Sequence, residues 1–422
     1  MTSFSKTSRA GTAALVLIAL AVPAAAASTA QAASPPAVTA TPTTSGARVT
    51  WTAVPGATSY VVGVRKHPTK SDYPTTWTSY PATAAAANIP IPRTDGQPRF
   101  VIARAKTGAG DVTAAPVQAR ALAPAVLAGE PLRFASLNIA IPNNTGFPGW
   151  PRRSALILEQ VKRQAPDVLL LQEAQNVTAG ANNRFKPLAD QFYVNGYSFD
   201  RSIEAPGTKS AGSRIAYQRS TYSLTSHGLI DMDTGLSNYV SWAKLRSKNT
   251  GHEFLAVSVH LNPFYNANCP ADIGKPSHNN PTYTQRHTFA SQASTLKRRI
   301  ASINTTRLPV LMGGDMNSNE VGDSGCKQAH EQFIDDGWTD MGSTARPTNL
   351  EFATTARFAT SGGGDPLPAR ANYGRIDYLY TQGLGGPTGY RTDIPWATAG
   401  STVLNERSSD HFMVIGATRL NQ

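Results

Sequence analysis

Long apolar segments are missing from most of this chain. After residue 33, no run approaches the ~20 apolar residues that a membrane-spanning helix requires. The one apolar stretch, Ala13–Val22, is shorter than that and ends at Pro23. It follows two basic residues and precedes the small-residue patterns Ala25–Ala27 and Ala30–Ala32, which is the arrangement of a secretory signal peptide. We therefore expect residues 1–33 to be a signal peptide and the mature protein to be soluble, secreted and without a transmembrane segment.

Cysteine is also scarce, since the chain has only Cys269 and Cys326. In an exported protein, an even and minimal count favours one disulfide over a metal site. Two unpaired thiols are the alternative, because a sequence does not establish the Cα separation that a bridge requires.

Acidic residues are fewer than basic ones, 27 against 39, and the formal net charge is +12. Loss of Lys6 and Arg9 with the signal peptide would leave +10. Residues 34–123 carry nine basic side chains against three aspartates, so this segment alone is +6. Such an imbalance favours a polyanionic partner: nucleic acid, an anionic cell wall or a lipid surface. A charged, solvated surface without a partner is the alternative.

Residues 34–123 have the pattern of a small all-β sandwich. Short alternating strands are separated by turn residues every eight to twelve positions. The order Val49, Trp51, Pro55-Gly56 and Tyr60 resembles a fibronectin type III domain, with Trp51 and Tyr60 facing inward. No catalytic cluster occurs here, so we expect a binding or spacing module, followed by a linker at 124–130.

In residues 131–422, strand-like runs alternate with helical ones, which is typical of an α/β domain. Helices are expected at 152–164, which Pro166 ends, and at 284–304. Strands are expected at 132–138, 168–172, 254–259, 309–313, 376–380 and 412–416.

Six short motifs stand at the ends of these strands. They are Leu137-Asn138, Leu171-Gln172-Glu173, Val259-His260-Leu261, Gly314-Asp315-Met316-Asn317, Arg375-Ile376-Asp377-Tyr378 and Ser409-Asp410-His411. Asn138, Glu173, His260 and Asp315 end their strands, whereas Asp377, Asp410 and His411 precede theirs. If the two groups of strands run antiparallel, all these side chains meet at one edge of the sheets.

Together these side chains suit cleavage of a phosphodiester. A carboxylate such as Glu173 can hold Mg²⁺, which neutralises charge that develops on the phosphate. A histidine with a carboxylate partner, here His411 with Asp377 or Asp410, can take a proton from water. Asp315 and Asn317 stand two residues apart on a turn and can face the same phosphate. Taken singly, each has a structural interpretation: Asn138 as a strand-end cap, Asp315 and Asn317 as an Asx-turn, His260 as a core histidine.

The ordered motifs resemble the endonuclease/exonuclease/phosphatase superfamily over residues 131–420. That resemblance implies a four-layer α/β/β/α sandwich with the active site at one end of the paired sheets. It implies Asn138, Glu173 and Asp410 at a Mg²⁺ site (Mn²⁺ and Ca²⁺ being the alternatives), and Asn138, His260 and Asn317 on the phosphate. It also implies Asp315 beside the leaving group and an Asp377–His411 pair that activates water.

We therefore predict a monomeric, secreted phosphodiesterase whose substrate is nucleic acid. Histidines at both 260 and 411 resemble the pancreatic-type deoxyribonucleases and the secreted bacterial sphingomyelinases. A phospholipid phosphodiesterase of the sphingomyelinase type is thus the enzymatic alternative. An exported binding protein without activity is the second alternative. The other histidines, at 227, 252, 278, 287 and 330, are expected to be structural or on the surface.

Overall fold

A computed structural model describes residues 34–65, 76–91, 99–114, 117–119, 121, 128–140, 149–174, 185–200, 212–232, 239–263, 288–320, 328–344, 347–350, 352–355, 375–394, 398–399, 402–403 and 408–420. The predicted signal peptide and both cysteines, Cys269 and Cys326, lie outside these residues, so cleavage and disulfide pairing stay predictions. Within the described ranges, no helix is long and apolar enough to span a bilayer.

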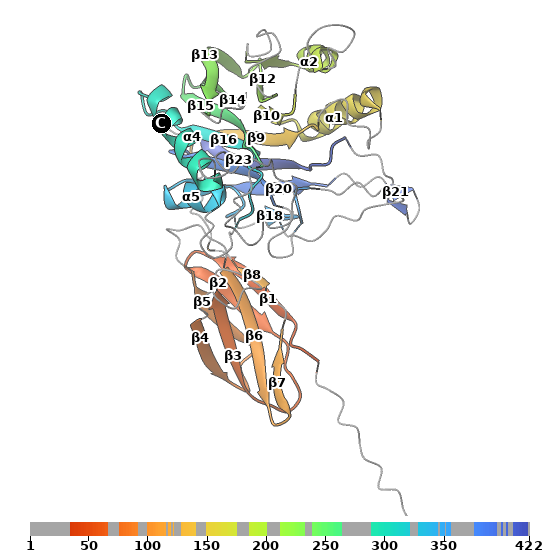
Figure 1. Cartoon of the computed structure of the whole chain (residues 1–422), viewed down its shortest axis with the longest axis vertical. Helices are drawn as coiled ribbons and strands as arrows, with labels where there is room; N and C mark the ends of the chain where they lie inside the picture. The colour runs from red at the N-terminus through yellow and green to blue at the C-terminus, as the bar shows by residue number, and fades with distance from the viewer. Residues whose placement is uncertain are drawn as a thin grey trace, which may run out of the picture.

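The N-terminal unit consists of two antiparallel sheets (Figure 1). One has the order β1 (Val38–Thr43), β2 (Gly46–Trp51), β5 (Ala86–Pro90). The other has the order β4 (Thr76–Pro81), β3 (Ala57–Arg65), β6 (Arg99–Thr107), β7 (Gly110–Thr113), and β8 (Val117–Ala119) also pairs with β6.

Apolar side chains from both of these sheets form one core. Trp51 and Tyr60 face inward, as predicted, with their ring centroids 5.6 Å apart. The Tyr60 hydroxyl accepts a hydrogen bond from the amide of Val54 (2.7 Å), so its polar end is satisfied within the core. The assignment to the fibronectin type III class stays a prediction.

Two larger sheets build the second unit. The seven-stranded sheet has the order β11 (Tyr197–Phe199), β12 (Arg214–Gln218), β10 (Val168–Gln172), β9 (Glu130–Asn138), β23 (Met413–Leu420), β20 (Gly389–Asp393), β18 (Pro347–Thr348). The six-stranded sheet has the order β13 (Tyr222–Asp231), β14 (Tyr239–Ser247), β15 (Glu253–His260), β16 (Val310–Asp315), β19 (Asp377–Gln382), β17 (Thr339–Asp340). A small hairpin joins β21 (Thr398–Ala399) to β22 (Thr402–Val403).

These sheets pack face to face, with helices on their outer faces, so the predicted four-layer α/β/β/α sandwich is confirmed. Side chains alternate along each strand. In β9, Leu132 and Phe134 point into the core between the sheets, whereas Ala135 and Leu137 pack against α1 (Trp150–Gln164) and α2 (Phe185–Val194). On the six-stranded sheet, α4 (Phe289–Ile303) and α5 (Ala329–Asp335) cover the outer face.

The helix ends follow local signals. In α1, Pro151 occupies the first turn, where no amide donor is needed, and the helix ends at Ala165 in the left-handed conformation (φ 41°), just before Pro166. The side chain of Thr288 caps α4 by accepting a hydrogen bond from the amide of Ser291 (3.2 Å). Of the helix predicted over 284–304, residues 284–287 lie outside the described part of the chain.

Strand direction brings the motifs together, as predicted. β9 and β10 are parallel, and so are β15 and β16, so Asn138 pairs with Gln172 and His260 with Asp315. β23 runs antiparallel to β9, and β19 runs antiparallel to β16, which places Asp377 opposite Asp315. The ends of the first group and the starts of the second therefore share one edge of the sandwich.

Gly314 is required for this close packing of β15 and β16. Its φ is 154°, and a Cβ built there would lie 1.8 Å from the carbonyl oxygen of Val259 on the neighbouring strand. The residue before Asp315 is therefore restricted to glycine.

Candidate active site

Asp315 lies at the centre of the motif residues and is 2% exposed. Its Oδ2 accepts a hydrogen bond from Asn138 Nδ2 (3.1 Å) and lies 3.6 Å from His260 Nε2 and 3.7 Å from His411 Nε2. Its Oδ1 accepts from the backbone amide of Asn317 (2.8 Å). One buried carboxylate thus connects four of the other predicted site residues.

Asn138 joins two carboxylates. Its Nδ2 donates to Glu173 Oε1 (3.0 Å) as well as to Asp315, while its Oδ1 accepts from the amide of Ala140 (3.0 Å). In this arrangement Asn138 orients Glu173 and Asp315. Its predicted contacts with a metal ion and a phosphate stay predictions, and its Oδ1 is already engaged by Ala140.

Asn317 has the structural role that the sequence allowed. With Asp315 it forms an Asx-turn, its own φ is 48°, and its side-chain amide donates to the carbonyl of Leu261 (2.7 Å). These contacts hold Asn317 next to His260, the residue before Leu261. The turn therefore has a structural role, and its predicted contact with a phosphate stays a prediction.

His411 and Asp377 form the predicted histidine–carboxylate pair, with His411 Nδ1 2.9 Å from Asp377 Oδ2. The backbone on both sides is fixed. Thr354 Oγ1 accepts from the amides of Ile376 and Asp377 (3.0 Å each), and Ser409 Oγ accepts from the amide of His411 (3.1 Å). The hydrogen bond at Nδ1 orients the ring and directs Nε2 toward Asp315.

The environment of the pair favours a protonated imidazole. Burial lowers the pKa of His411, but the carboxylates of Asp377 and Asp315 outweigh this effect and raise the pKa to about 10. Burial raises the pKa of Asp377 to about 6, against the opposing effect of the His411 cation. We place the shared proton on His411, because Asp315 is a second carboxylate that faces it.

Glu173 and Asp410 are close enough to repel each other. Burial raises the pKa of Asp410, the His411 cation lowers it, and the Glu173 carboxylate raises it. Glu173 follows β10 in the left-handed conformation (φ 57°) and has its Oε1 on Asn138. With Asp315 and Asp377, four carboxylates gather at this edge. Oxygen ligands with an excess of negative charge suit a hard divalent cation such as Mg²⁺, so the residues present fit a metal ion.

A second set of ligand atoms is also close together. One atom each from Asp315, Asp377 and His411 lie within 4.8 Å of one another, the spacing of a metal site. We favour Glu173 and Asp410 as the cation ligands, because Asp377 and His411 are already hydrogen-bonded to each other. The predicted ligand set of Asn138, Glu173 and Asp410 stays a prediction.

Arg153 is a site residue that the sequence motifs did not include. It lies on α1, is fully buried, and donates to the carbonyls of Ile139 and Ala140 after β9 and of Ser408 before the Ser409-Asp410-His411 motif. Burial lowers its pKa, and the carboxylates of Asp410 and Glu173 raise it. The available signal was its position four residues before Ile157, on the buried face of the helix.

Arg375 supports the other side of the site. Its guanidinium makes a two-point ion pair with Asp340 (2.7 and 2.9 Å), contacts Glu320, and lies over the ring of Tyr378. The Tyr378 hydroxyl donates to a backbone carbonyl in return, at Arg375 (2.6 Å) or Ser318 (3.1 Å). These contacts hold Arg375 and Tyr378 in place, and Asp377 lies between them in the chain.

The two sheets are hydrogen-bonded to each other directly below the site. Gln172 Oε1 accepts from Ser136 Oγ (3.2 Å), and Gln172 Nε2 donates to Ser258 Oγ on β15 (3.1 Å). Ser258 Oγ donates to the carbonyl of Leu171 (2.9 Å). All these side chains are buried, so the contacts hold the edge with Glu173 against the edge with His260.

Comparison with known proteins gives one family match. Residues 135–411 match the model of the Endonuclease/Exonuclease/phosphatase family. Among curated proteins, no sequence matches the chain.

The chain is similar to several solved structures of low sequence identity. The endonuclease/exonuclease/phosphatase from Bacteroides vulgatus is 17% identical, with a TM-score of 0.50, over 69% of this chain and 99% of that one. The mannosyl-6-phosphatase of Bacteroides thetaiotaomicron is 18% identical (TM-score 0.47; 68% and 98%), and truncated TDP2 of Caenorhabditis elegans is 16% identical (TM-score 0.45; 68% and 97%). At 17% identity, the likeness to the Bacteroides vulgatus structure concerns the fold alone.

Replacing Arg153 with Met should destabilise the second unit by roughly 2–4 kcal/mol, because three buried carbonyls would lose their donor. Arg152→Met is the matched control, since Arg152 is exposed on the same helix, and it should change stability by less than about 0.5 kcal/mol. Urea unfolding followed by tryptophan fluorescence measures both variants. Equal midpoints for Arg153→Met and Arg152→Met would show that these hydrogen bonds contribute little.

Proposed function

Because the chain belongs to the endonuclease/exonuclease/phosphatase family, we propose that it is a secreted, divalent-metal-dependent phosphodiesterase that hydrolyses extracellular nucleic acid. The observation that supports this proposal most strongly is the His411–Asp377 pair at 2.9 Å, next to Asp315 and at the same edge as Glu173 and Asp410. It combines a group that moves protons with oxygen ligands for a cation.

Each residue then has a task in the hydrolysis of a phosphate ester. A cation held by Glu173 and Asp410 would neutralise the charge that develops on the phosphate oxygens. Water forms a bond to phosphorus while the ester P–O bond breaks. The same cation would disfavour the imidazolium and so lower the pKa of His411. Neutral His411 Nε2 then accepts the proton of the water, Asp377 keeps the ring oriented, and the leaving oxygen takes up a proton from solvent as it departs. Asn138 keeps Glu173 and Asp315 in place.

Nucleic acid is the proposed substrate because of charge. Without the proposed signal peptide the chain carries a net +10, and residues 34–123 contribute +6 of it. Contacts with phosphates supply most of the non-specific affinity of proteins for nucleic acids. Secretion is proposed from the signal-peptide pattern of residues 1–33, and protein that stays in the cells with an intact Met1 N-terminus would contradict it.

Removal of divalent cations should abolish turnover. With plasmid DNA, RNA and sphingomyelin as substrates, we expect cleavage of nucleic acid in Mg²⁺ or Mn²⁺ and a loss of at least about 100-fold in EDTA, because the carboxylates alone repel a phosphate. Activity should return when excess Mg²⁺ is added. Full activity in EDTA would contradict the proposed metal dependence, and cleavage of sphingomyelin alone would favour the phospholipid alternative.

Replacing His411 with Ala should lower kcat by roughly 10²–10⁴-fold, since the group that accepts the proton is lost. His252→Ala is the matched control, because His252 lies in the turn between β14 and β15, at the opposite edge of the sheet. Thermal unfolding should show both variants folded. If His411→Ala retains the activity of the His252 control, the assigned role is wrong, and if no phosphodiester is cleaved by any form, the non-catalytic alternative gains support.

A further inference from the structure

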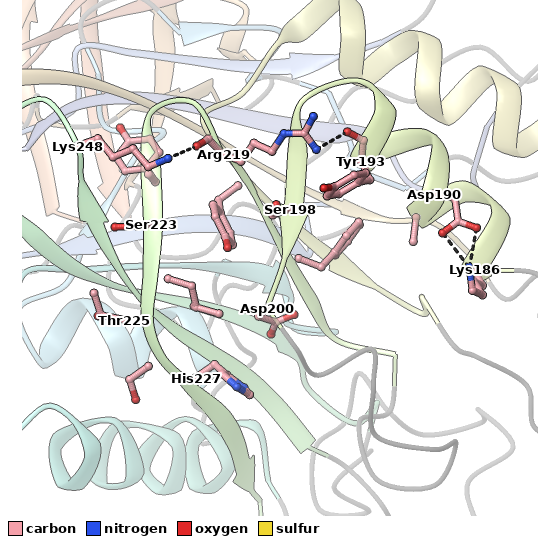
Figure 2. Close-up of a pocket in the computed structure, with 16 residues that line it drawn as sticks. Lys186, Asp190, Tyr193, Ser198, Asp200, Arg219, Ser223, Thr225, His227 and Lys248 are labelled. Carbon is pink, nitrogen blue, oxygen red and sulfur yellow. Dashed lines mark hydrogen bonds and ion pairs between the residues drawn. The ribbon is translucent and has the colours of Figure 1, made fainter.

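A large cavity lies on the flank of the sandwich, where β11 ends one sheet and β13 ends the other. Its volume is ≈ 1040 Å³, which is enough for a ligand of several rings. Figure 2 shows it bounded by α2, by β11 and by the length of β13. None of the predicted site residues lines it, so the cavity is separate from the Asp315 cluster.

An aromatic ring and two cations form one end of this flank pocket. Tyr193 is 59% exposed, and the guanidinium of Arg219 lies 4.2 Å from its ring centroid. Arg219 also donates to the carbonyl of Tyr193 (2.9 Å), and Lys248 Nζ donates to the carbonyl of Arg219 (2.5 Å). Figure 2 shows these three residues in a row. Both cations are thus held by backbone carbonyls, which do not cancel their charge.

The acidic residues of the pocket have cationic neighbours of their own. Asp190 is paired with Lys186 one turn earlier on α2 (2.7 Å). Asp200 is fully buried and interacts with Arg214, whose pKa burial lowers and Asp200 raises. With these two pairs neutral, Arg219 and Lys248 leave the pocket positive. Ser198, Ser223 and Thr225 add hydroxyl groups to its wall.

The pocket runs along β13, from the turn that carries Lys248 toward the edge that holds the candidate active site. β11 runs parallel to β10, with β12 between them, and β13 runs parallel to β15, with β14 between them. Asp200 is level with Leu170, and His227 is level with Ala256. This end of the pocket therefore lies two strand spacings (about 10 Å) to the side of the ends that carry Glu173 and His260, and three to four residues (about 10–13 Å) short of them along the strands. From His227 back to Tyr222, the pocket extends about 16 Å along β13.

We infer that the flank pocket binds a single-stranded stretch of nucleic acid that extends beyond the cleaved bond, with a base stacked on Tyr193 and phosphates on Arg219 and Lys248. Stacked aromatic rings next to cations are how proteins hold single strands without reading their sequence. This inference rests on the proposed function for the identity of the ligand.

The test measures binding of a short fluorescent oligodeoxythymidylate to the full chain by anisotropy, in EDTA so that no cleavage occurs. Tyr193→Ala should weaken binding roughly tenfold, because one stacked base is lost. Lys248→Gln should weaken it at low salt and reduce the slope of log affinity against log salt by about 0.7, as expected for one lost phosphate contact.

Two matched controls and a second probe make the test specific. Val194→Ala removes an exposed apolar side chain next to Tyr193, and Arg298→Gln removes a cation on α4, on the other side of the sandwich. Both should bind like the unmodified chain. Polyphosphate has charge but no bases, so it should bind Tyr193→Ala normally and Lys248→Gln weakly. If Tyr193→Ala and Lys248→Gln bind the oligonucleotide as the controls do, the inference is wrong.

Turnover of bis-p-nitrophenyl phosphate separates this inference from the proposed function. This small diester does not reach the pocket, so Tyr193→Ala and Lys248→Gln should hydrolyse it normally and show a raised KM only with single-stranded DNA. Normal turnover with unchanged oligonucleotide binding overturns the inference alone. Binding that depends on Tyr193 in a chain that hydrolyses no diester supports the pocket and overturns the proposed function.

Discussion

Burial of the Asp315 carboxylate is the constraint around which this molecule is arranged. A buried charge is costly unless donors surround it. Here the donors are Asn138 on β9 and the amide of Asn317, and the imidazoles at 260 and 411 lie 3.6 and 3.7 Å from the same carboxylate. These groups belong to both sheets, so the carboxylate is compensated only when β9 and β16 meet with their ends aligned. The stability of the fold and the assembly of the site therefore depend on the same contacts.

Two features make that alignment precise. Gly314 removes the side chain that would collide with Val259, so β15 and β16 can place His260 beside Asp315. Across the core, Gln172 and Ser258 hydrogen-bond one sheet to the other directly below the site. A buried polar contact of this kind disfavours sliding of apolar faces, because a shifted register would leave both groups without partners. The site therefore rests on strands whose register is fixed on two sides.

The site residues at the ends of strands were the ones that the sequence predicted best. The motifs at Glu173, His260 and Asp315 each follow an apolar run, and parallel neighbours bring such ends together. Arg153 was not predicted, since one arginine among several on an amphipathic helix shows its burial only through its spacing to Ile157. No sequence pattern indicated the role of Thr354. Its hydroxyl accepts hydrogen bonds from the backbone amides of a segment more than twenty residues later in the chain.

The amino-acid sequence alone determined the positions of most strands and helices and the types of side chain at the strand ends, because apolar periodicity and chain order encode them locally. The four layers were implied by the resemblance to the family. The tertiary structure decided which oxygen faces which nitrogen: the pairing of His411 with Asp377, and the use of Asn138 to orient two carboxylates. It also decided that the flank between β11 and β13 is hollow and positive. These properties depend on distances between residues far apart in the chain, and no local pattern encodes such distances.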